Sequence, residues 1–296
     1  MVVYDLELNI IIYYKLQLKI HWDVYSKIEG YLGFYGITKD PETKDFMMIM
    51  KFANGGDLRC VLSSSFSSIL WRDKIHLLLK LTMDLKILHN LGYYHKDFHS
   101  GNILQNDSAN YLSDFGLSGP ANEQKSDSKI YGVLPYIAPE ILNGKPYTCT
   151  SDIYSFGVIM SELSTGKPPF YDIRHDENLA LDICNGLRPE FGKGTPEIYK
   201  KLAYRCMNAI SNQRPTAEEL YNELESWKDK IDYQGNETEI VFKEADEEIP
   251  NISTSYEKNP DAIYISRMFT FNNLSNPVNS SIVTSYLEED EKGNVI

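Results

Sequence analysis

The sequence lacks several features that would place it in particular classes of protein. Its 296 residues include only four cysteines, widely separated and without the CxxC spacing of a metal site: Cys60, Cys149, Cys184 and Cys206. The first 20 residues carry charges among their apolar positions and do not have the basic start of a signal peptide. These absences argue against a zinc module, a signal peptide and a membrane span, and they predict a cytoplasmic protein with free thiols.

Positive charge is also scarce. The chain has 29 Lys and Arg against 42 Asp and Glu, a formal net charge of −13. This balance argues against nucleic acid or an anionic membrane as the main partner. The acidity is concentrated at one end, because residues 231–296 hold 13 acidic and only 4 basic residues. Together with many Asn and Ser, this composition predicts a largely flexible acidic tail.

The hydrophobic pattern predicts a small β-rich part followed by a mainly helical part. Residues 4–20 alternate in part between apolar and polar, which favours a strand. Apolar runs at 31–37 and 46–52 flank the polar turn "TKDPETKD", which predicts a β-hairpin. "NGGD" ends the second strand and caps a short helix. Apolar spacing predicts helices over 58–62, 71–91, 151–164, 176–185, 196–207 and 216–228.

The loop-rich stretch "YYHKDFHSGNILQNDSANYLSDFGLS", residues 93–118, contains the groups that a phosphoryl transfer requires. That reaction needs a group to accept the proton of the acceptor hydroxyl, a divalent metal ion on the phosphates, and a fixed nucleotide. Asp97 is a candidate for the proton acceptor. Asn102 and Asp114 offer the oxygen ligands that Mg²⁺ prefers.

These residues resemble the signature of the protein kinase family, and the tyrosine-kinase-like group is the most similar in style. "HKD" at 95–97 with Asn102 stands for the catalytic loop H-R-D-x-x-x-x-N, and "DFG" at 114–116 is the metal-binding motif. The resemblance implies an α+β, protein-kinase-like fold with a reduced β-rich N-lobe over 1–52. A mainly helical C-lobe follows over 53–230, and the acidic tail over 231–296.

Three further matches support the same family. "APE" at 138–140 resembles the end of the activation segment, and Asp152 the buried aspartate that braces the catalytic loop. Arg214, in "NQRPT", matches the arginine that pairs with Glu140. These motifs favour a protein substrate over a small molecule, which related phosphotransferases with the same Asp–Asn–Asp order modify. The implied function is transfer of the ATP γ-phosphoryl group to a protein Ser, Thr or Tyr hydroxyl, with ATP and Mg²⁺ as cofactors.

The resemblance also implies a nucleotide site. In "FMMIMKFANGGDL", Met50 falls at the gatekeeper position, and the backbones of Lys51 and Ala53 are expected to bind adenine. Asp57 is expected near the ribose, and Leu104 under the base. Ordinary core packing is the alternative interpretation for Met50 and Leu104.

Two elements of the family pattern are missing from the sequence. Neither the glycine-rich loop over the phosphates nor the strand lysine of a V-A-I-K motif is found before residue 30. Glu7 takes the helix-C glutamate position if residues 5–20 form that helix rather than a strand. Two interpretations therefore stay open: an active kinase represented by an incomplete chain, or a pseudokinase that acts as a scaffold.

The remaining departures concern the acceptor and its regulation. Lys96 replaces the usual arginine, and His99 takes the place where serine/threonine kinases carry lysine, either near the transferred phosphate or as a solvent-facing loop residue. An upstream kinase is a possible partner, because a phosphate on the activation segment has Lys96 nearby to pair with. Its candidate acceptors are Ser118, Ser126, Ser128 and Tyr131.

Overall fold

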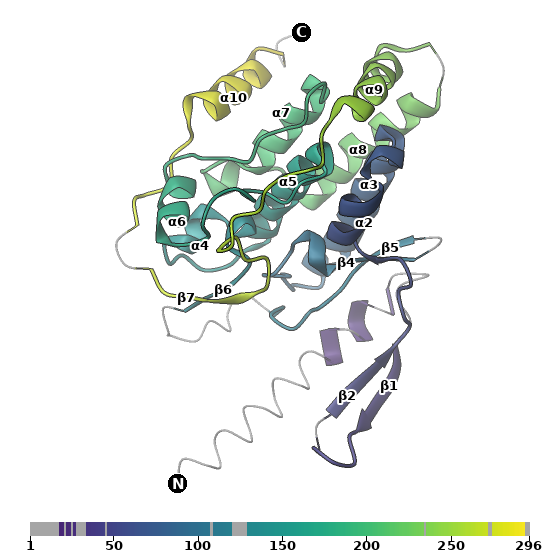
Figure 1. Cartoon of the computed structure of the whole chain (residues 1–296), viewed down its shortest axis with the longest axis vertical. Coiled ribbons are helices and arrows are strands. Elements are labelled where there is room, and N and C mark those ends of the chain that lie inside the picture. The colour runs from purple at the N-terminus through teal and green to yellow at the C-terminus, as the bar shows by residue number, and fades with distance from the viewer. Residues whose placement is uncertain are drawn as a thin grey trace.

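The computed structural model describes residues 18–20, 22–24, 26–27, 34–44, 46–106, 109–119, 129–233, 235–271 and 274–293. Figure 1 shows a helical body with a hairpin that projects from it, so the fold is the α+β, kinase-like arrangement expected from the sequence. Predictions for Glu7, Ser126 and Ser128 lie outside the described residues.

The hairpin is formed by strands β1 (Phe34–Lys39) and β2 (Phe46–Met50), which pair in antiparallel register. This confirms the hairpin predicted around the polar turn. Before the hairpin in the sequence, residues 18–20 and 22–24 are helical. The partial alternation predicted a strand over 4–20, and this prediction is wrong at its described end. The reason is that Ile20 and Val24, four residues apart, lie on one helix face and are fully buried.

Helix α5 (Cys149–Thr165) is at the centre of the C-lobe, and its residues 151–164 are all buried. The helix predicted over 151–164 is therefore confirmed, and apolar residues on every side of it account for its burial. Around it lie the other α-helices of the lobe: α2 (Leu58–Ser65), α3 (Trp71–Asn90), α4 (Pro139–Leu142), α6 (Glu177–Cys184), α7 (Glu197–Cys206) and α8 (Ala217–Asp232). Short 3₁₀ helices are η1 (Phe66–Ser68), η2 (Ser100–Asn102), η3 (Leu134–Tyr136), η4 (Ser211–Gln213) and η5 (Ile249–Asn251).

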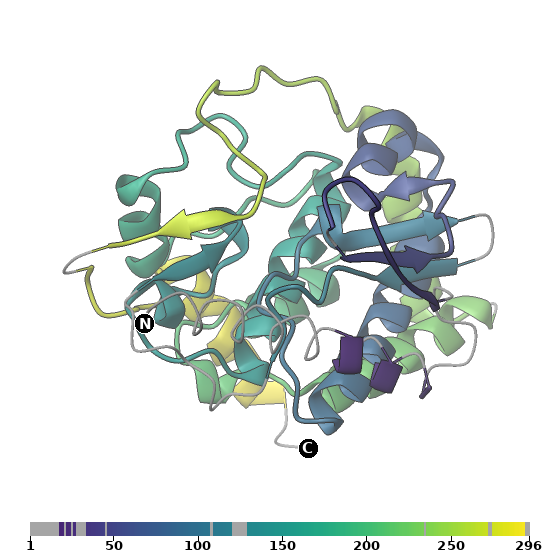
Figure 2. The same cartoon turned by 90° about the horizontal axis from the view of Figure 1, so that it is seen from below.

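A small antiparallel sheet lies where the hairpin joins the C-lobe. It consists of β3 (Gly56–Asp57), β4 (Ile103–Asn106) and β5 (Ala109–Leu112), in the order β3-β4-β5. Figure 2 shows this sheet beneath α3 and close to the hairpin. Because β4 directly follows the catalytic loop and β5 directly precedes the DFG motif, the sheet holds these two loops side by side.

Residues 231–296 differ from the flexible tail that their composition predicts. They contain α9 (Glu237–Glu248), β7 (Arg267–Phe269) and α10 (Ser281–Gly293), and β7 pairs with β6 (Ile130–Gly132). The reason is a small set of apolar residues among the charges. Phe242 and Ala245 of α9 are buried against the C-lobe, and the Phe242 ring centroid lies 5.8 Å from that of Trp71. The division into domains at residues 52 and 230 remains a prediction.

No helix within the described part of the chain is long and apolar enough to cross a membrane. All four cysteines are free thiols, and Cys184 and Cys206 are buried.

Candidate active site

The catalytic loop is held in place by the buried carboxylate of Asp152 on α5. Its two oxygens accept hydrogen bonds from the backbone N–H groups of His95 (2.9 Å) and Lys96 (3.0 Å), and Oδ2 also lies 2.9 Å from His89 Nε2. Burial favours the protonated acid, but the hydrogen bond and charge of His89 outweigh it and lower the pKa of Asp152. The bracing role predicted for Asp152 is confirmed by these contacts.

Asp97 directly follows the anchored residues His95 and Lys96 in the sequence. Its side chain is almost fully buried, and Oδ2 lies 3.7 Å from His99 Nε2. Burial raises the pKa of Asp97, but the nearby His99 side chain has the opposite effect, and the net pKa is below the ordinary value. Oδ1 has no hydrogen-bond partner. The carboxylate is therefore ionised at neutral pH and has one oxygen free to accept a proton.

His99 is buried, which contradicts the interpretation as a solvent-facing loop residue. Its Nδ1 accepts a hydrogen bond from the backbone of Gly101 at 3.0 Å, so Nε2 is the ring nitrogen turned toward Asp97. The histidine thus contacts the candidate base itself.

Asn102 connects the catalytic loop to the DFG motif. Its Nδ2 donates to the backbone oxygen of Asp97 at 2.9 Å. Its own backbone oxygen accepts from both the N–H (2.8 Å) and the hydroxyl (2.9 Å) of Ser113. Asp114 follows Ser113 immediately, so these bonds bring the Asp97, Asn102 and Asp114 segments to one place, as the sequence predicted.

Two non-glycine residues beside the site have left-handed backbone conformations. The φ angle is 68° at Lys96 and 58° at Asp114, a region that disfavours side chains with a Cβ. The exposed carboxylate of Asp114 accepts a hydrogen bond from the N–H of Gly116 at 3.0 Å. The strained backbone is held at Lys96 by Asp152 and at Asp114 by this turn.

The donor set at this place fits Mg²⁺. The Asn102 amide nitrogen is engaged with the Asp97 backbone, which leaves its side-chain oxygen for another partner. Asp114 adds an exposed carboxylate. Mg²⁺ takes oxygen ligands, keeps several waters and uses only one or two protein carboxylates or amides. One amide oxygen and one carboxylate match that requirement.

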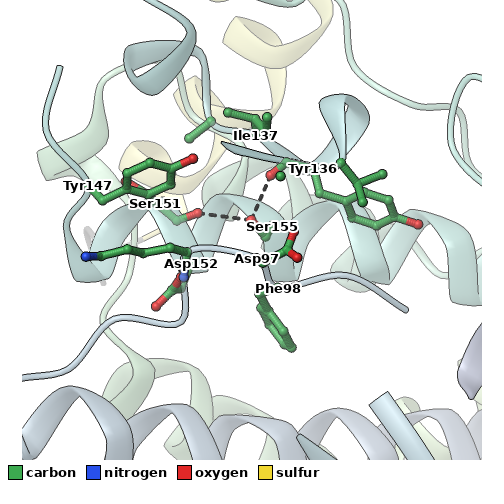
Figure 3. A pocket seen from close by; sticks show the side chains of 12 residues that line it. Asp97, Phe98, Tyr136, Ile137, Tyr147, Ser151, Asp152 and Ser155 are labelled. Carbon is green, nitrogen blue, oxygen red and sulfur yellow. Dashed lines mark hydrogen bonds between the residues drawn. The ribbon is translucent and has the colours of Figure 1, made fainter. Parts of the chain in front are cut away.

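A small cavity lies between the catalytic loop and the end of the activation segment (Figure 3). Its volume is about 10 Å³, room for about one water. Asp97 and Ser155 line it, and the Ser155 hydroxyl donates to the backbone oxygen of Tyr136 at 2.7 Å. The cavity is on the side of Asp97 that faces the activation segment.

The residues predicted for nucleotide binding lie at the junction of the hairpin and the small sheet. Met50 ends β2, exposed Lys51 follows it, and Ala53 accepts a hydrogen bond from Gly56 N at 3.4 Å. Asp57 and Leu104 are paired across β3 and β4. The structure pairs Asp57 with Leu104, and the contacts of all five residues with a nucleotide remain a prediction.

Asp57 has a local role that the "NGGD" pattern predicted. Its Oδ1 accepts a hydrogen bond from Cys60 N at 2.9 Å and caps helix α2. Its Oδ2 lies 3.4 Å from Cys60 Sγ. Any contact of Asp57 with a ribose has to be shared with this cap.

The activation segment is fixed to the C-lobe by a buried ion pair. Arg214 donates to the two oxygens of Glu140 at 2.7 and 2.6 Å, and both side chains are nearly inaccessible. The pairing predicted from "APE" and "NQRPT" is therefore confirmed. Among the candidate phosphorylation sites, Ser118 is buried and donates to the backbone oxygen of His95, whereas Tyr131 on β6 is exposed.

Sequence reasoning missed a buried polar network behind His99. Glu162 of α5 accepts hydrogen bonds from Ser100 (2.9 Å) and from Tyr136 (2.6 Å), and Arg59 Nε lies 3.9 Å from it. Burial raises the pKa of Glu162, and the charge of Arg59 opposes the rise. The only signal in the sequence was a glutamate inside an otherwise apolar helix, which requires a partner when buried.

Comparisons with known proteins agree with this geometry. The family described as "Protein tyrosine and serine/threonine kinase" matches residues 27–224. Two probable serine/threonine-protein kinases of Dictyostelium discoideum are 29% identical over 181 residues (60% of this chain, 11% of that protein) and 32% identical over 207 residues (64% and 24%). A probable LIM domain-containing serine/threonine-protein kinase of the same organism is 26% identical over 208 residues (70% and 21%).

The chain spans at most 24% of the length of these three relatives. The family match, however, covers more than half of this chain and includes every residue of the site described above. The chain therefore belongs to the protein tyrosine and serine/threonine kinase family.

Proposed function

We propose that this chain transfers the γ-phosphoryl group of ATP to a serine or threonine hydroxyl of a protein, as part of signal transduction. The observation that carries the proposal is the buried carboxylate of Asp97, which is ionised, has one oxygen without a hydrogen-bond partner, and lines the cavity beside the activation segment. The relatives described above are named serine/threonine-protein kinases, which favours these hydroxyls over that of tyrosine.

The geometry supports a role for each residue in this proposal. Asp97 accepts the proton of the acceptor hydroxyl, and His99 keeps the carboxylate ionised and oriented. Asn102 and Asp114 would hold Mg²⁺, which would supply neutralisation of the charge on the phosphates. Met50, Lys51, Ala53, Asp57 and Leu104 form the site for the adenosine part of ATP.

A scaffold without catalysis is the second candidate. The observation that favours it is the sequence itself, since residues 1–29 contain no glycine and Gly30 is the first. A glycine-rich loop is thus missing from the sequence before residue 30, and in the family that loop contributes to positioning, on which phosphoryl transfer depends.

The test is phosphate transfer from ATP to a serine/threonine protein substrate, measured with the purified chain and with Asp97→Asn. General-base catalysis contributes about 10²–10⁴-fold, so we expect turnover to fall by at least 100-fold. Asp182→Asn, an exposed aspartate on α6, is the matched control and is expected to leave turnover unchanged. Equal turnover by Asp97→Asn and the unaltered chain contradicts the assignment of the base.

Binding of Mg²⁺–ATP separates the two candidates. A ligand that binds only the folded state stabilises it by about 2.7 kcal/mol at 100 times its Kd, and thermal unfolding detects this shift. Asp114→Ala is expected to abolish the part of the shift that depends on Mg²⁺. Binding without any turnover favours the scaffold.

A further inference from the structure

A segment of the C-terminal part of the chain crosses the acceptor side of the site. We call residues 259–271 the tail strap. Its strand β7 lies antiparallel to β6 of the activation segment, with Ile130 opposite Phe269 and Gly132 opposite Arg267. Figures 1 and 2 both show β7 beside β6, far from the hairpin. The strap thus extends the activation segment as an added strand.

Several hydrogen bonds fix the part of the strap that precedes β7 in the sequence. His175 Nδ1 lies 3.0 Å from the backbone oxygen of Ile263, and the backbone N–H of His175 donates to Asp261 O at 3.2 Å. The Tyr264 hydroxyl donates to Pro169 O at 2.8 Å. These bonds set the register of the strap along the C-lobe.

Arg59 holds the strap from the side of the buried polar network. Its Nη1 donates to Tyr264 O at 3.1 Å, and its guanidinium lies 4.8 Å from the centroid of the Tyr264 ring. Arg59 also lies near Glu162, which binds Ser100 of the catalytic loop. The strap is therefore connected directly to the residues that support His99 and Asp97.

Between the Tyr264 anchor and β7, the chain presents Ser266 to the candidate base. Gly132, which is opposite Arg267, is so near that a Cβ there would lie 3.5 Å from Asp97 Oδ1. Ser266 immediately precedes Arg267 and is exposed, so the strand register brings it to the edge of the site at Asp97. An interaction between the Ser266 side chain and the Asp97 carboxylate, which lowers the pKa of Asp97, agrees with this placement.

We propose that the tail strap occupies the site of the acceptor peptide and that Ser266 is an intramolecular phosphoryl acceptor. This inference rests on the proposed function. The Ser266 oxygen forms a bond to the terminal phosphorus of ATP, and the bond from that phosphorus to its bridging oxygen breaks. ADP leaves with the electron pair, and the hydroxyl proton passes to Asp97.

The neighbouring hydroxyl groups explain why Ser266 is the acceptor. Tyr264 is buried, and its hydroxyl is bound to Pro169 O. The Tyr131 hydroxyl donates to Met268 Sδ at 3.5 Å, at the middle residue pair of β6 and β7. Ser266 is exposed and adjoins Asp97. A serine in this place also agrees with the serine/threonine preference proposed above.

The product has a consequence for the strap. A phosphoserine carries about −1.5 to −2 charges at pH 7, and at position 266 this charge faces the Asp97 carboxylate. Repulsion between the two groups weakens the docking of the strap. Modification of Ser266 therefore opens the acceptor site to other proteins.

The experiment starts with the full chain, Mg²⁺–ATP and a serine-containing test peptide in one reaction, and both acceptors are followed by mass spectrometry. We expect one phosphate on Ser266, absent in Ser266→Ala and retained in Ser275→Ala, a strap-independent serine that binds Asn185. The rate constant is expected to stay unchanged over a 50-fold dilution of the protein. A rate that falls with dilution overturns the intramolecular step, and a phosphorylated peptide with unmodified Ser266 overturns the acceptor role.

Hydrogen exchange supplies a readout that does not need catalysis. We expect the amides of 130–132 to exchange at least 10-fold faster in Tyr264→Ala than in the unaltered chain, because the strap loses its anchor. Tyr256→Ala, which alters a tail tyrosine whose ring centroid lies 4.6 Å from that of Tyr171, is the control and leaves this exchange unchanged. Equal exchange in Tyr264→Ala and the unaltered chain overturns the docking of the strap.

The two readouts separate the inference from the function on which it rests. If neither the peptide nor Ser266 is phosphorylated, the proposed function fails together with the acceptor role. The exchange comparison still decides, in that case, whether the strap covers the acceptor site.

Discussion

The hairpin and the C-lobe differ sharply in how their apolar residues are used. In β1 and β2, most side chains are exposed, including Tyr35, Ile37, Phe46, Met47, Met48 and Ile49. In α5, fourteen consecutive residues are buried. A two-stranded hairpin alone is marginally stable in water, whereas a helix buried on all sides unfolds only with the whole domain.

This difference divides the two halves of the candidate site. Asp97 and Asn102 are attached to the rigid C-lobe through Asp152 and Ser113. Met50 and Lys51 are attached to the exposed hairpin. The half proposed to accept the proton is therefore positioned by the core itself, whereas the half proposed to bind adenine depends on an element with little buried surface. The predictions below test this contrast, beginning with the largest expected effect.

Removal of Arg214 is expected to destabilise the C-lobe most. Arg214→Met leaves the buried Glu140 carboxylate without its partner, and breaking a buried ion pair in this way costs about 3–5 kcal/mol. Arg205→Met is the matched control, because its pair with Glu223 is partly exposed and is expected to contribute about 1 kcal/mol or less. Urea unfolding measures both. Equal losses of unfolding free energy in the two variants would show that burial does not determine how much these ion pairs contribute to stability.

The same substitution in the two regions gives a direct comparison. Ile159→Ala on α5 is expected to lower the free energy of unfolding by about 2–5 kcal/mol, because Ile159 is fully buried. Ile37→Ala in β1 is expected to change it by about 0.5 kcal/mol or less, because Ile37 is 47% exposed. Thermal or urea unfolding of both variants tests the difference. A loss at position 37 as large as that at 159 contradicts the contrast between the regions.

The brace at Asp152 predicts a dependence on pH with a defined sign. Its pKa is lower in the folded chain than the ordinary value of 3.8, so its stabilisation is present above that value and is lost as the pH falls through the folded pKa. Asp152→Asn is expected to cost about 1–3 kcal/mol at pH 7, since it weakens charge-assisted hydrogen bonds. The difference from the unaltered chain shrinks below pH 3.8. Urea unfolding of both chains between pH 2 and 7 checks this. A difference in unfolding free energy that stays constant over this range would argue against a contribution from the charge of Asp152.

The sequence predicted the elements that local patterns determine. Helical periodicity predicted α3 and α5, and the polar turn predicted the hairpin. The residues 18–20 were misassigned because alternation and helical spacing are hard to distinguish in a short apolar stretch. The order in residues 231–296 was missed because a few buried residues such as Phe242 outweigh an unfavourable composition.

The candidate site was predicted to the extent that its residues form sequence motifs. Asp97, Asn102 and Asp114 belong to two such motifs, and the structure brings these two together. Ser266 and Arg59 belong to none. They meet the catalytic loop only through pairing between β6 and β7 and through contacts more than 200 residues apart, such as Arg59 with Tyr264. Single-sequence patterns do not contain such long-range pairings.

The left-handed conformations of Lys96 and Asp114 set a limit on how this chain can be engineered. The left-handed conformation costs a residue with a Cβ about 1–2 kcal/mol. A substitution by glycine at either position removes this cost and so raises the melting temperature in a stability screen. The same exchange gives the loops access to many other shapes and removes the side chains there. Selection for heat resistance and selection for a defined site therefore oppose each other at these two positions.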